Sequence, residues 1–584
     1  MTTTEPGATV SYDVVILGNH LATGLLATVL AKQDLRVLLV GSPDDTVLPS
    51  GDSTVPYTTA VLHLLAERFD VPEIASFAHF EDLPEQVRRN SGIKKSLAFL
   101  HHTAGRGHDP AHAVQFHVPG EHSEWHLYRP VVDEYARELA VSYGASVLPD
   151  RASATEVRLA SDAVHLTFGG GQTATARFVV DACGADSPLR AVTGDGDPGT
   201  LTLRSRMMHA YLRDVRKFEE CSRLTDYHRA TAWSRGTVHH LFDGGWIQVV
   251  DFRNHHDAVN DLCSVTVGLD PDRFDDLPAG PEEAFRALVA RFPSLAEQFA
   301  SAAVQGDWTT SPSWQRRAAV THGPRWFAME RSACRTDEFL SRDVTMTAEV
   351  VHALGAALPR AVRDEQAAGA ALAEVAAFQD ALIEFNDQML AAARTACGSF
   401  ALWNAYSRVW LLWQILAHLS LKRATNDAVA AGTWDPVEQF ADGGLWFRTP
   451  DGLRQMLDWF FGVFARVRDG GLGQAEAADM IFRELRRARF VPPLYRFGDP
   501  DARYYHFTKA RRLLMVAWVM TVAPADFKRL LTKDNVTGRR DDAPVPTPAR
   551  GPVPAGDGRV ETNGDGRADG SAAGAPGVTQ PGRR

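Results

Sequence analysis

Short apolar runs and amphipathic stretches alternate at the start of the chain. Residues 13–17 and 36–40 are continuous apolar runs with β-branched residues, which is typical of buried parallel strands. Residues 25–32 lie between them and have helical periodicity, and residues 18–24 form the predicted turn. A helix between two such strands is a βαβ unit, so the pattern predicts a doubly wound α/β domain from the first residues onward.

Further strands are indicated beyond this unit. Residues 163–168 alternate between apolar and polar positions and are followed by a glycine turn and an apolar run over 174–184, which predicts a hairpin leading into a buried strand. A second β-rich region has the spacing of an antiparallel meander, with runs at 237–242, 245–252 and 263–269. We therefore expect an inserted antiparallel β-sheet at about 200–275.

Helical patterns dominate from about residue 345 to residue 533. The most apolar runs there, 409–419 and 513–523, are shorter than the roughly 20 residues of a membrane span, so buried helices are expected. The last fifty residues are rich in Pro, Gly and charge and are expected to be disordered. The predicted domains are residues 1–394, a helical domain at 395–533, and a tail at 534–584.

Composition narrows the class of protein. With 584 residues the chain is too long for one core, so two or three domains are expected. The net charge of -11 argues against a nucleic-acid partner. The five cysteines include no CxxC pair, and no His pair belongs to a helical HxxxH, so neither a disulfide framework nor a metal site is expected. A polar, acidic start without a signal peptide favours a cytoplasmic protein.

The first turn carries a partial nucleotide-binding motif. A strand, a Gly-rich turn and a helix place a diphosphate at the helix N-terminus, and the full motif is G-x-G-x-x-G. Only Gly18 is in place, because His20 and Thr23 occupy the other two glycine positions. Gly24, next to Thr23, would relieve the close contact between helix and strand. Taken alone, the turn is equally consistent with a βαβ unit that binds no nucleotide.

Several segments resemble, in the same order, motifs of the flavin-dependent halogenases. They are GDSTVPYTTAVLHLLAERFDVPEI at 51–74, SGIKKSLAFLHH at 91–102, VQFHVPGEHSEWHLYRPVVDEYARELAVSYGA at 114–145 (with the H-x-x-R-x-x-x-D form as HLYRPVVD), FVVDACGADSPLR at 178–190, TVHHLFDGGWIQVVDFRNH at 237–255 and NDLCSV at 260–265. The matches cover roughly residues 13–350. The helical remainder is similar to the C-terminal domain of members that act on polyketide and carrier-bound substrates, such as the tetracycline halogenases.

This resemblance implies a fold and an activity. The fold is a doubly wound FAD-binding domain with an inserted antiparallel β-sheet for the substrate, followed by a C-terminal helical domain. FAD, reduced by a separate flavin reductase, uses oxygen and halide to form hypohalous acid. A lysine then delivers the halogen to an electron-rich carbon. The substrate is an aromatic or polyketide-type intermediate of secondary metabolism, either a small molecule or bound to a carrier protein.

The resemblance also assigns roles to residues of this chain. Lys94 matches the delivery lysine, although Lys94 and Lys95 could instead be a solvated basic pair. Asp181 and Gly184 belong to the second flavin motif, although Asp181 at a strand end could be a plain turn residue. Asp337, in the loop near the flavin, is also assigned to cofactor binding.

Two further motifs depart from the family pattern. In the strand that lines the substrate tunnel Trp246 is kept, whereas Gln248 and Asp251 replace a Trp and a Pro; alternatively they are ordinary strand residues. The halide-binding loop keeps Ser341 and Arg342, but Asp343 replaces a glycine. A carboxylate about 4 Å from a chloride repels it by roughly 4 kcal/mol at an effective dielectric of 20. Pairing with Arg342 or Arg335 would reduce that repulsion.

These departures leave alternatives open. Oxygenation or another oxidation without halide is one variant of the enzymatic hypothesis. A catalytically inactive relative that serves as a binding or scaffold protein is a different class of function. Gly41 stands near the end of the second strand, where the nucleotide-binding motif usually has an acidic residue that bonds a ribose hydroxyl. The departures at His20, Thr23, Gly41 and Asp343 favour the inactive relative, whereas the presence of Lys94 and Asp181 favours the enzyme.

Overall fold

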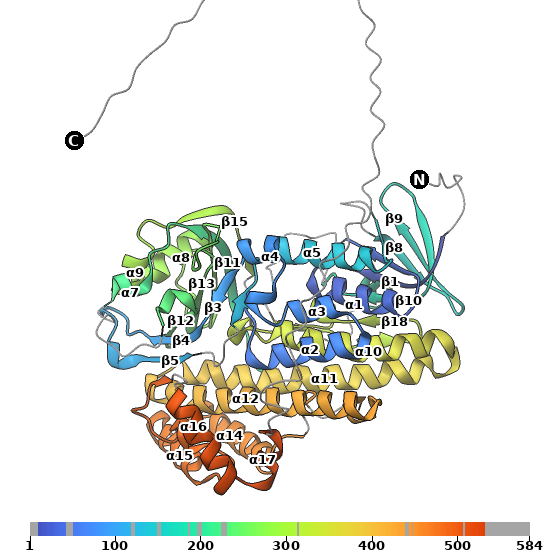
Figure 1. Cartoon of the computed structure of the whole chain (residues 1–584). Helices are drawn as coiled ribbons and strands as arrows, with labels where there is room; N and C mark the ends of the chain where they lie inside the picture. Colours follow the sequence, from blue (N-terminus) through green and yellow to red (C-terminus); the bar gives the residue numbers. More distant parts are fainter. Residues whose placement is uncertain are drawn as a thin grey trace, which may run out of the picture. The chain divides into compact units, whose positions relative to one another are not determined.

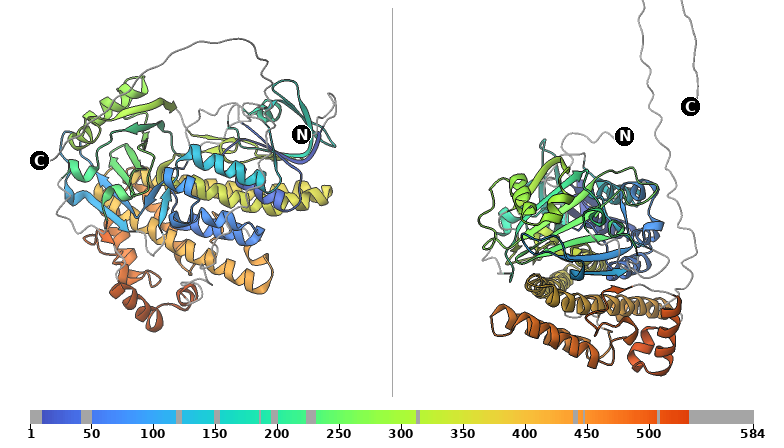
Figure 2. Two further views of the ribbon diagram at one scale, coloured as in Figure 1. Left: turned by 45° about the horizontal axis from the view of Figure 1, so that its top comes forward. Right: turned by 90° about the vertical axis from the view of Figure 1, so that its left-hand side faces the viewer.

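The computed structural model describes residues 10–41, 51–117, 123–148, 154–184, 187–194, 201–222, 231–311, 315–438, 443–446, 448–505 and 509–531. The predicted disordered tail, 534–584, lies outside the described residues. Two β-sheets lie side by side, and two long helices run beneath both of them (Figure 1). Figure 2 shows the same arrangement from two other directions.

The first sheet contains the predicted parallel strands. Its order is β17-β18-β10-β1-β2-β7, and β9 pairs with β10 and with β8. Leu17 at the end of β1 lies beside Asp181 of β10 on one side and Val40 of β2 on the other. The strands are β1 (Val10–Leu17), β2 (Val37–Val40), β7 (Ser146–Val147), β8 (Ala154–Leu159), β9 (Val164–Phe168), β10 (Thr173–Asp181), β17 (His322–Gly323) and β18 (Trp326–Ala328).

Helix α1 (Leu21–Lys32) begins at Leu21 rather than at residue 25, so the predicted turn over 18–24 was too long. The side chain of Thr23 explains the difference. Thr23 Oγ1 accepts a hydrogen bond from His20 N at 3.0 Å and donates to His20 O at 2.8 Å. These bonds satisfy a backbone group that the helix terminus leaves unpaired, and they close the first turn within the stretch expected to be irregular.

The second sheet has the order β15-β11-β14-β13-β12-β4-β5-β20. The predicted meander is confirmed, because neighbouring strands of β12, β13 and β14 pair antiparallel. The sheet is wider than the predicted insert at 200–275, since β4, β5, β15 and β20 lie outside that range. The strands are β4 (Ser96–His101), β5 (Ala113–His117), β11 (Arg206–Arg213), β12 (Thr237–Phe242), β13 (Gly245–Asp251), β14 (Cys263–Leu269), β15 (Ala303–Ser311) and β20 (Tyr504–Tyr505).

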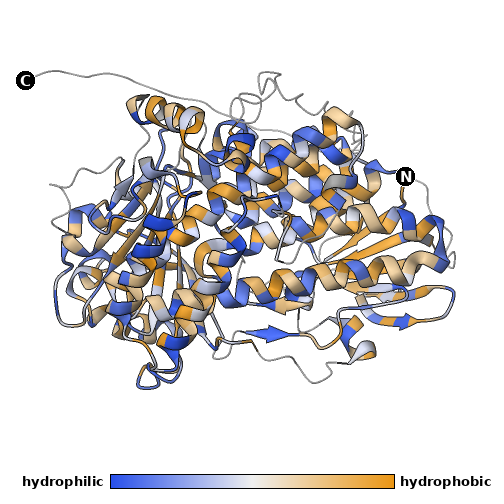
Figure 3. Cartoon of the chain, turned by 90° about the horizontal axis from the view of Figure 1, so that it is seen from below, coloured by the Kyte–Doolittle hydropathy of each residue, from blue (hydrophilic) through white to orange (hydrophobic). Residues whose placement is uncertain are grey.

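The predicted helical region begins with α10. Apolar residues recur along these helices between hydrophilic ones (Figure 3). One hydrophobic core joins α1 and β1 to the C-terminal helices, and α11 runs through the predicted boundary at 394/395, which stays a prediction. The helices are α10 (Asp343–Arg363), α11 (Glu365–Ala396), α12 (Phe400–Ala431), α14 (Leu453–Arg468), α15 (Gln474–Arg487), α16 (Lys509–Thr521) and α17 (Ala525–Leu530).

The two apolar runs of the helical region differ in burial. The run at 409–419 lies in α12 and is largely buried. The prediction of a buried helix is wrong for much of α16, where Leu513 and Met520 are 72% and 74% exposed. Among the described helices, none is both long enough and apolar enough to cross a membrane. Within the described ranges none of the five cysteines forms a disulfide, and no group of potential metal ligands is found.

Candidate active site

The first element of the site is the crevice at the carboxyl ends of β1 and β10. Gly18 follows β1 with φ +122°, and its N–H donates to Val40 O at 2.8 Å. A Cβ at Gly18 would lie 3.1 Å from His20 Nε2 and 3.3 Å from Thr23 Cγ2. The turn therefore requires glycine at this position, both for its conformation and for the close approach of the His20 ring.

The neighbouring residues of the partial motif have structural partners. A Cβ at Gly24 would lie 2.7 Å from Ala136 Cβ and 2.8 Å from the Ala136 backbone. Ala136 belongs to α5 (Arg129–Ser142), so Gly24 permits close packing between two helices. The expectation that Gly24 relieves a contact between helix and strand is wrong. Thr23 is fully buried and caps α1.

On the other side of the crevice, Asp181 ends β10 and is fully buried. Its Oδ1 accepts a hydrogen bond from Cys183 N at 3.0 Å. Burial raises the pKa of Asp181 to about 6, while hydrogen bonds from Cys183, Ser187 and Ser332 act in the opposite direction. Gly184 follows with φ +95°, and its N–H donates to Ser332 Oγ at 2.8 Å. Asp181 is thus a buried acceptor at the strand end and not an exposed turn residue.

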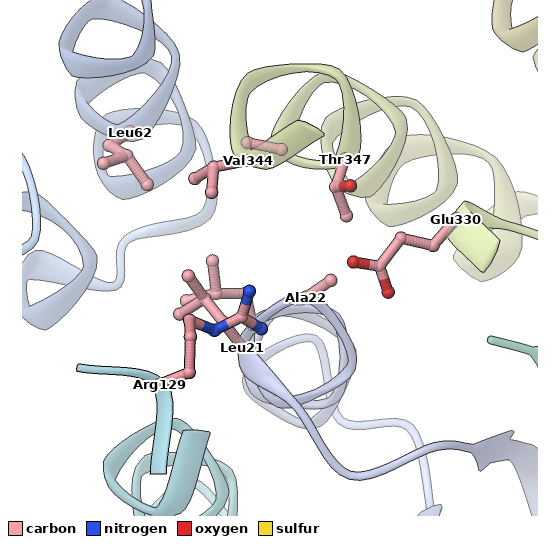
Figure 4. Close-up of a pocket in the computed structure, with 9 residues that line it drawn as sticks. Leu21, Ala22, Leu62, Arg129, Glu330, Val344 and Thr347 are labelled. Atoms are coloured by element: carbon pink, nitrogen blue, oxygen red, sulfur yellow. The ribbon is translucent and has the colours of Figure 1, made fainter. Parts of the chain in front are cut away.

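A pocket opens beside this crevice (Figure 4). Its walls are the first turns of α1 and α10 together with Leu62, Arg129 and Glu330. Arg129 is buried, and its Nη2 donates to Asp133 Oδ1 at 2.9 Å. The same Asp133 oxygen accepts from Leu21 N at 2.8 Å, so it binds the N-terminus of α1. The pocket therefore lies where helix N-termini and an arginine favour a negatively charged ligand.

The second element of the site is Lys94. Strand β3 (Gly92–Lys94) pairs antiparallel with β6 (Glu124–His126), which places Lys94 opposite Glu124. Lys94 Nζ lies 2.9 Å from Glu124 Oε2 and also donates to Thr54 O. The Lys94 side chain is 1% exposed, so the alternative of a solvated basic pair is wrong for this residue. Lys95 is partly exposed and lies near Glu81.

Burial and charge act in opposite directions on this pair. Burial lowers the pKa of Lys94, and the carboxylate of Glu124 raises it. For Glu124, burial raises the pKa and Lys94 lowers it. The nearby His126 and His239 are fully buried, and burial together with the charge of Lys94 lowers the pKa of each imidazole, that of His239 to about 3. Both imidazoles are therefore neutral near pH 7. The carboxylate of Glu124 is the group that compensates the positive charge of Lys94.

The residues predicted to line a substrate tunnel divide between the two faces of β13. Trp246 and Gln248 share one face, because side chains alternate along a strand. Trp246 stacks on Phe339 with the ring centroids 4.8 Å apart and an interplanar angle of 10°. Gln248 Oε1 lies 3.1 Å from His239 Nε2. Asp251 lies on the opposite face and pairs with Arg253 at 3.2 Å, so the structure does not bring it together with Trp246 and Gln248.

The loop that contains Phe339 has an unusual backbone. Leu340 and Ser341 have φ values of 65° and 51°, in the left-handed region, although neither is glycine. Each such residue costs roughly 1–2 kcal/mol, so the surrounding contacts must hold the loop in place. Asp337 supplies several of these contacts. It accepts from Phe339 N at 3.0 Å and from Ser205 Oγ at 2.5 Å, and it pairs with Arg394 at 2.8 Å.

The other loop residues have distinct environments. Arg342 is buried, its guanidinium lies 4.8 Å from the ring centre of Trp413, and Nη2 lies 4.0 Å from Glu349 Oε2. Asp343 begins α10, and its Oδ1 accepts from Thr336 Oγ1 at 3.5 Å. Burial raises the pKa of Asp343 to about 6, so its negative charge is reduced below that pH.

Two segments connect Lys94 with the crevice. The segment 51–55 carries Thr54, whose carbonyl accepts from Lys94, and Gly51, where a Cβ would meet Val344 Cγ2 at 2.5 Å. The segment 339–344 carries Ser341, whose Oγ lies 3.5 Å from Gln248 Oε1, and Val344, which lines the pocket. Lys94, the face of β13 that carries Trp246 and Gln248, and the pocket are therefore parts of one continuous region.

Comparison with known proteins identifies the relatives of this chain. No protein-family model matches it. Tetracycline 7-halogenase of Kitasatospora aureofaciens is 28% identical over 527 residues, which cover 89% of this chain and 95% of that protein. Monodechloroaminopyrrolnitrin halogenase PrnC of Pseudomonas fluorescens is 28% identical over 534 residues, covering 89% and 93%. The crystal structure of halogenase PltM with phloroglucinol and FAD matches with a TM-score of 0.78 and 26% identity, covering 84% and 99%.

This chain is a relative of the flavin-dependent halogenases. The flavin-dependent brominase Bmp2, in a triple mutant, shares the fold at a TM-score of 0.51 and 16% identity. The predicted resemblance is thereby confirmed over nearly the whole chain, as is the predicted fold of an α/β module followed by helices.

Three residues of this halogenase-like site were missed by sequence reasoning. Glu124 carries no motif signal, because only the pairing of β3 with β6 places it beside Lys94. Arg129 stands in the HLYRPVVD motif, and the spacing to Asp133 was a signal that could have assigned it to the crevice. Glu330 lies upstream of the loop, and its position became evident only from the folded chain.

Proposed function

We propose that the chain is an FAD-dependent halogenase that transfers halogen to an electron-rich carbon of an aromatic or polyketide-type small molecule. One observation carries this proposal. Lys94 is buried against Glu124 and Thr54, and the segments 51–55 and 339–344 link it to the pocket beside β1 and β10. A separate flavin reductase supplies the reduced cofactor, and the substrate is either free or attached to a carrier protein.

The crevice has residues that fit FAD. Gly18 and Gly184 have φ values of +122° and +95°, and neither has a Cβ that would keep a ligand away from the backbone. Asp181, buried between them at the strand end, would accept a hydrogen bond from a ribityl or ribose hydroxyl. Arg129 and the N-terminus of α1 would face the diphosphate. The exception is His20, which contacts Glu330 within the same crevice.

Bound and reduced FAD supplies the oxidation of halide by oxygen, and the residues of the chain direct the product. A lysine ammonium has three N–H donors. Lys94 uses donors toward Thr54 O and Glu124, which leaves one to hydrogen-bond hypohalous acid. Glu124 holds the ammonium in place and would accept a proton from it. Nζ would then attack the halogen of hypohalous acid, so that the N–X bond forms as the X–O bond breaks, and the oxygen leaves as water with a second proton from the amine. The stacked rings of Trp246 and Phe339 exclude water from the adjoining space.

The test compares two neighbouring lysines. Purified protein is incubated with FAD, a flavin reductase, NADH, oxygen, chloride or bromide, and phenolic or pyrrolic substrates. Lys94→Ala should abolish halogenated product while FAD binding is kept. Lys95→Ala is the matched control, because Lys95 is partly exposed and pairs at the surface, and it should retain most of the activity.

The alternatives give different results in the same assay. If an oxygenated product forms without halide, the reaction is a monooxygenation and not a halogenation. Absence of FAD binding, seen as no change in melting temperature at saturating FAD, would overturn the proposal and leave a non-enzymatic relative. Equal loss of activity in both lysine variants would remove the special role of Lys94.

A further inference from the structure

Two residues far apart in the sequence meet across the crevice. His20 Nε2 lies 3.0 Å from Glu330 Oε2, and each side chain is only 11% exposed. The same nitrogen lies 3.3 Å from Ala182 O, directly after β10. The pair therefore connects the turn that follows β1 with the turn that precedes the loop at 334–343.

Glu330 has a backbone conformation that is unfavourable for a residue with a side chain. Its φ of 52° lies in the left-handed region, where glycine is accommodated at no steric cost. A side chain at this position projects into the pocket, where Glu330 faces Arg129 and the first turn of α1 (Figure 4). A carboxylate thus occupies part of the space where helix N-termini favour an anionic ligand.

The positive groups of the crevice already have protein carboxylates as partners. Leu21 N and Arg129 Nη2 both donate to Asp133 Oδ1. Although burial acts to lower it, the pKa of Arg129 is raised by the nearby carboxylates, first Asp133 and then Glu330. A diphosphate that enters the crevice must compete with the carboxylates of Asp133 and Glu330 for these positive groups. Of the two carboxylates, Glu330 is the one that contacts His20.

We propose that the His20–Glu330 pair is a latch that competes with the diphosphate of a dinucleotide for this crevice, so that cofactor binds only when Glu330 turns away. This inference rests on the proposed function, because it concerns the same FAD site. A ligand that binds only the open form has its apparent affinity reduced by the fraction of protein in that form. The latch makes the chain a weak binder of FAD, and the pair sets that affinity.

The test measures FAD affinity in the full-length protein by quenching of flavin fluorescence. Glu330→Gln removes the charge and keeps the shape, and Glu330→Gly also relieves the backbone. Both should lower the Kd for FAD about tenfold or more, and His20→Gly should act in the same direction. Glu297→Gln is the control, since this exposed carboxylate pairs with Arg216 away from the crevice, and it should leave the Kd unchanged. Kd values of both Glu330 variants within twofold of wild type would overturn the latch.

A second probe separates this inference from the proposed function. ADP has the diphosphate without the isoalloxazine ring, and its binding is measured as a rise in melting temperature. If the Glu330 variants gain stabilisation by ADP but bind no FAD, the latch stands and the proposed function fails. If all variants bind FAD equally, the latch fails and the function stands. If neither ligand stabilises any variant, the latch is overturned. Should Glu330→Gly not fold, Glu330→Gln decides.

Discussion

Lys94 Nζ lies 2.9 Å from Glu124 Oε2, and the two side chains are 1% and 4% exposed. The pairing of β3 with β6 creates this contact, and Thr54 O is a further acceptor for Lys94. Each ion alone would be strongly disfavoured at such a depth, because desolvation of a charge costs several kcal/mol. Lys94 and Glu124 are therefore tolerated only as a pair.

Glu124→Ala should lower the free energy of unfolding by about 3–5 kcal/mol, because it leaves the Lys94 ammonium buried without its carboxylate. The double variant Lys94→Met, Glu124→Leu should recover most of that loss, because it removes both charges and keeps the volume. Urea denaturation measures all three proteins. A double variant no more stable than Glu124→Ala would contradict the account of the pair.

Gly24→Ala should destabilise the protein by about 1–3 kcal/mol, because the added methyl would lie 2.7 Å from Ala136 Cβ and 2.8 Å from its backbone. Gly369→Ala is the matched control. Gly369 is exposed in α11, and a Cβ there meets nothing within 4 Å, so the change should stabilise by up to about 1 kcal/mol. Both are followed by urea denaturation, and a neutral Gly24→Ala would mean that α5 can shift away from α1.

Much of the fold could be predicted from local patterns. Strands β1 and β2 form where continuous apolar runs are bounded by turn residues, because burial on both faces leaves such a run in the sequence. Strands β12 and β14 form where the spacing of an antiparallel meander predicts them. The width of the second sheet could not be predicted, since β4 and β15 come from distant segments and sequence spacing does not encode their pairing. The exposed side of α16 was also missed, because its composition alone resembles that of a core helix.

The site was predictable where a motif fixes both residue and location. Lys94, Trp246 and Gln248 lie in the region that joins the pocket, as the order of motifs implied. Asp251 was grouped with them because it stands at the Pro position of the same family motif, yet side chains alternate along a strand and Asp251 lies on the other face. Glu124 could not be found, because its proximity to Lys94 depends on strand register.

Asp181→Asn should stabilise the protein at neutral pH. The pKa of Asp181 is raised by burial from 3.8 to about 6, so the folded state binds this proton more tightly than the unfolded state does. Stability from this group is greatest at low pH and is lost as pH rises from 3.8 through 6. The advantage of the variant over wild type in urea should therefore grow by about 2 kcal/mol between pH 4.5 and 7.5.

Asp272→Asn is the control for that measurement, because Asp272 is an exposed carboxylate that pairs with Arg204. The difference between Asp272→Asn and wild type is measured over the same pH range, and the growth expected for Asp181→Asn must exceed it. If the difference in free energy of unfolding between Asp181→Asn and wild type stays constant with pH, the prediction fails. The fold would then stabilise the ionised Asp181 carboxylate although it is buried. The same variant should bind FAD more weakly if Asp181 accepts from a cofactor hydroxyl.

Asp343→Asn should lower the KM for halide about tenfold or more at pH 7.5. If halide binds at the 336–343 loop, an ionised Asp343 near it repels the anion, and each 1.4 kcal/mol of repulsion changes affinity tenfold. Burial raises the pKa of Asp343 to about 6, so the wild-type carboxyl gains a proton as the pH falls below that value. The wild-type KM should therefore decrease between pH 7.5 and 5.5 and approach that of the variant.

The measurement is the initial rate against chloride concentration at each pH, with reductase in excess. Gln248→Trp would restore the Trp of the family motif, but it is not combined with Asp343→Asn. Gln248 is only 4% exposed and contacts His239, so the larger ring would overpack this position and lower the free energy of unfolding by about 1–3 kcal/mol. Asp343→Asn alone keeps the volume of the loop and changes only the charge. Equal KM values for the two proteins at pH 7.5 would show that halide binds away from Asp343. Arg342, which is buried in the same loop, would then be the next residue to substitute.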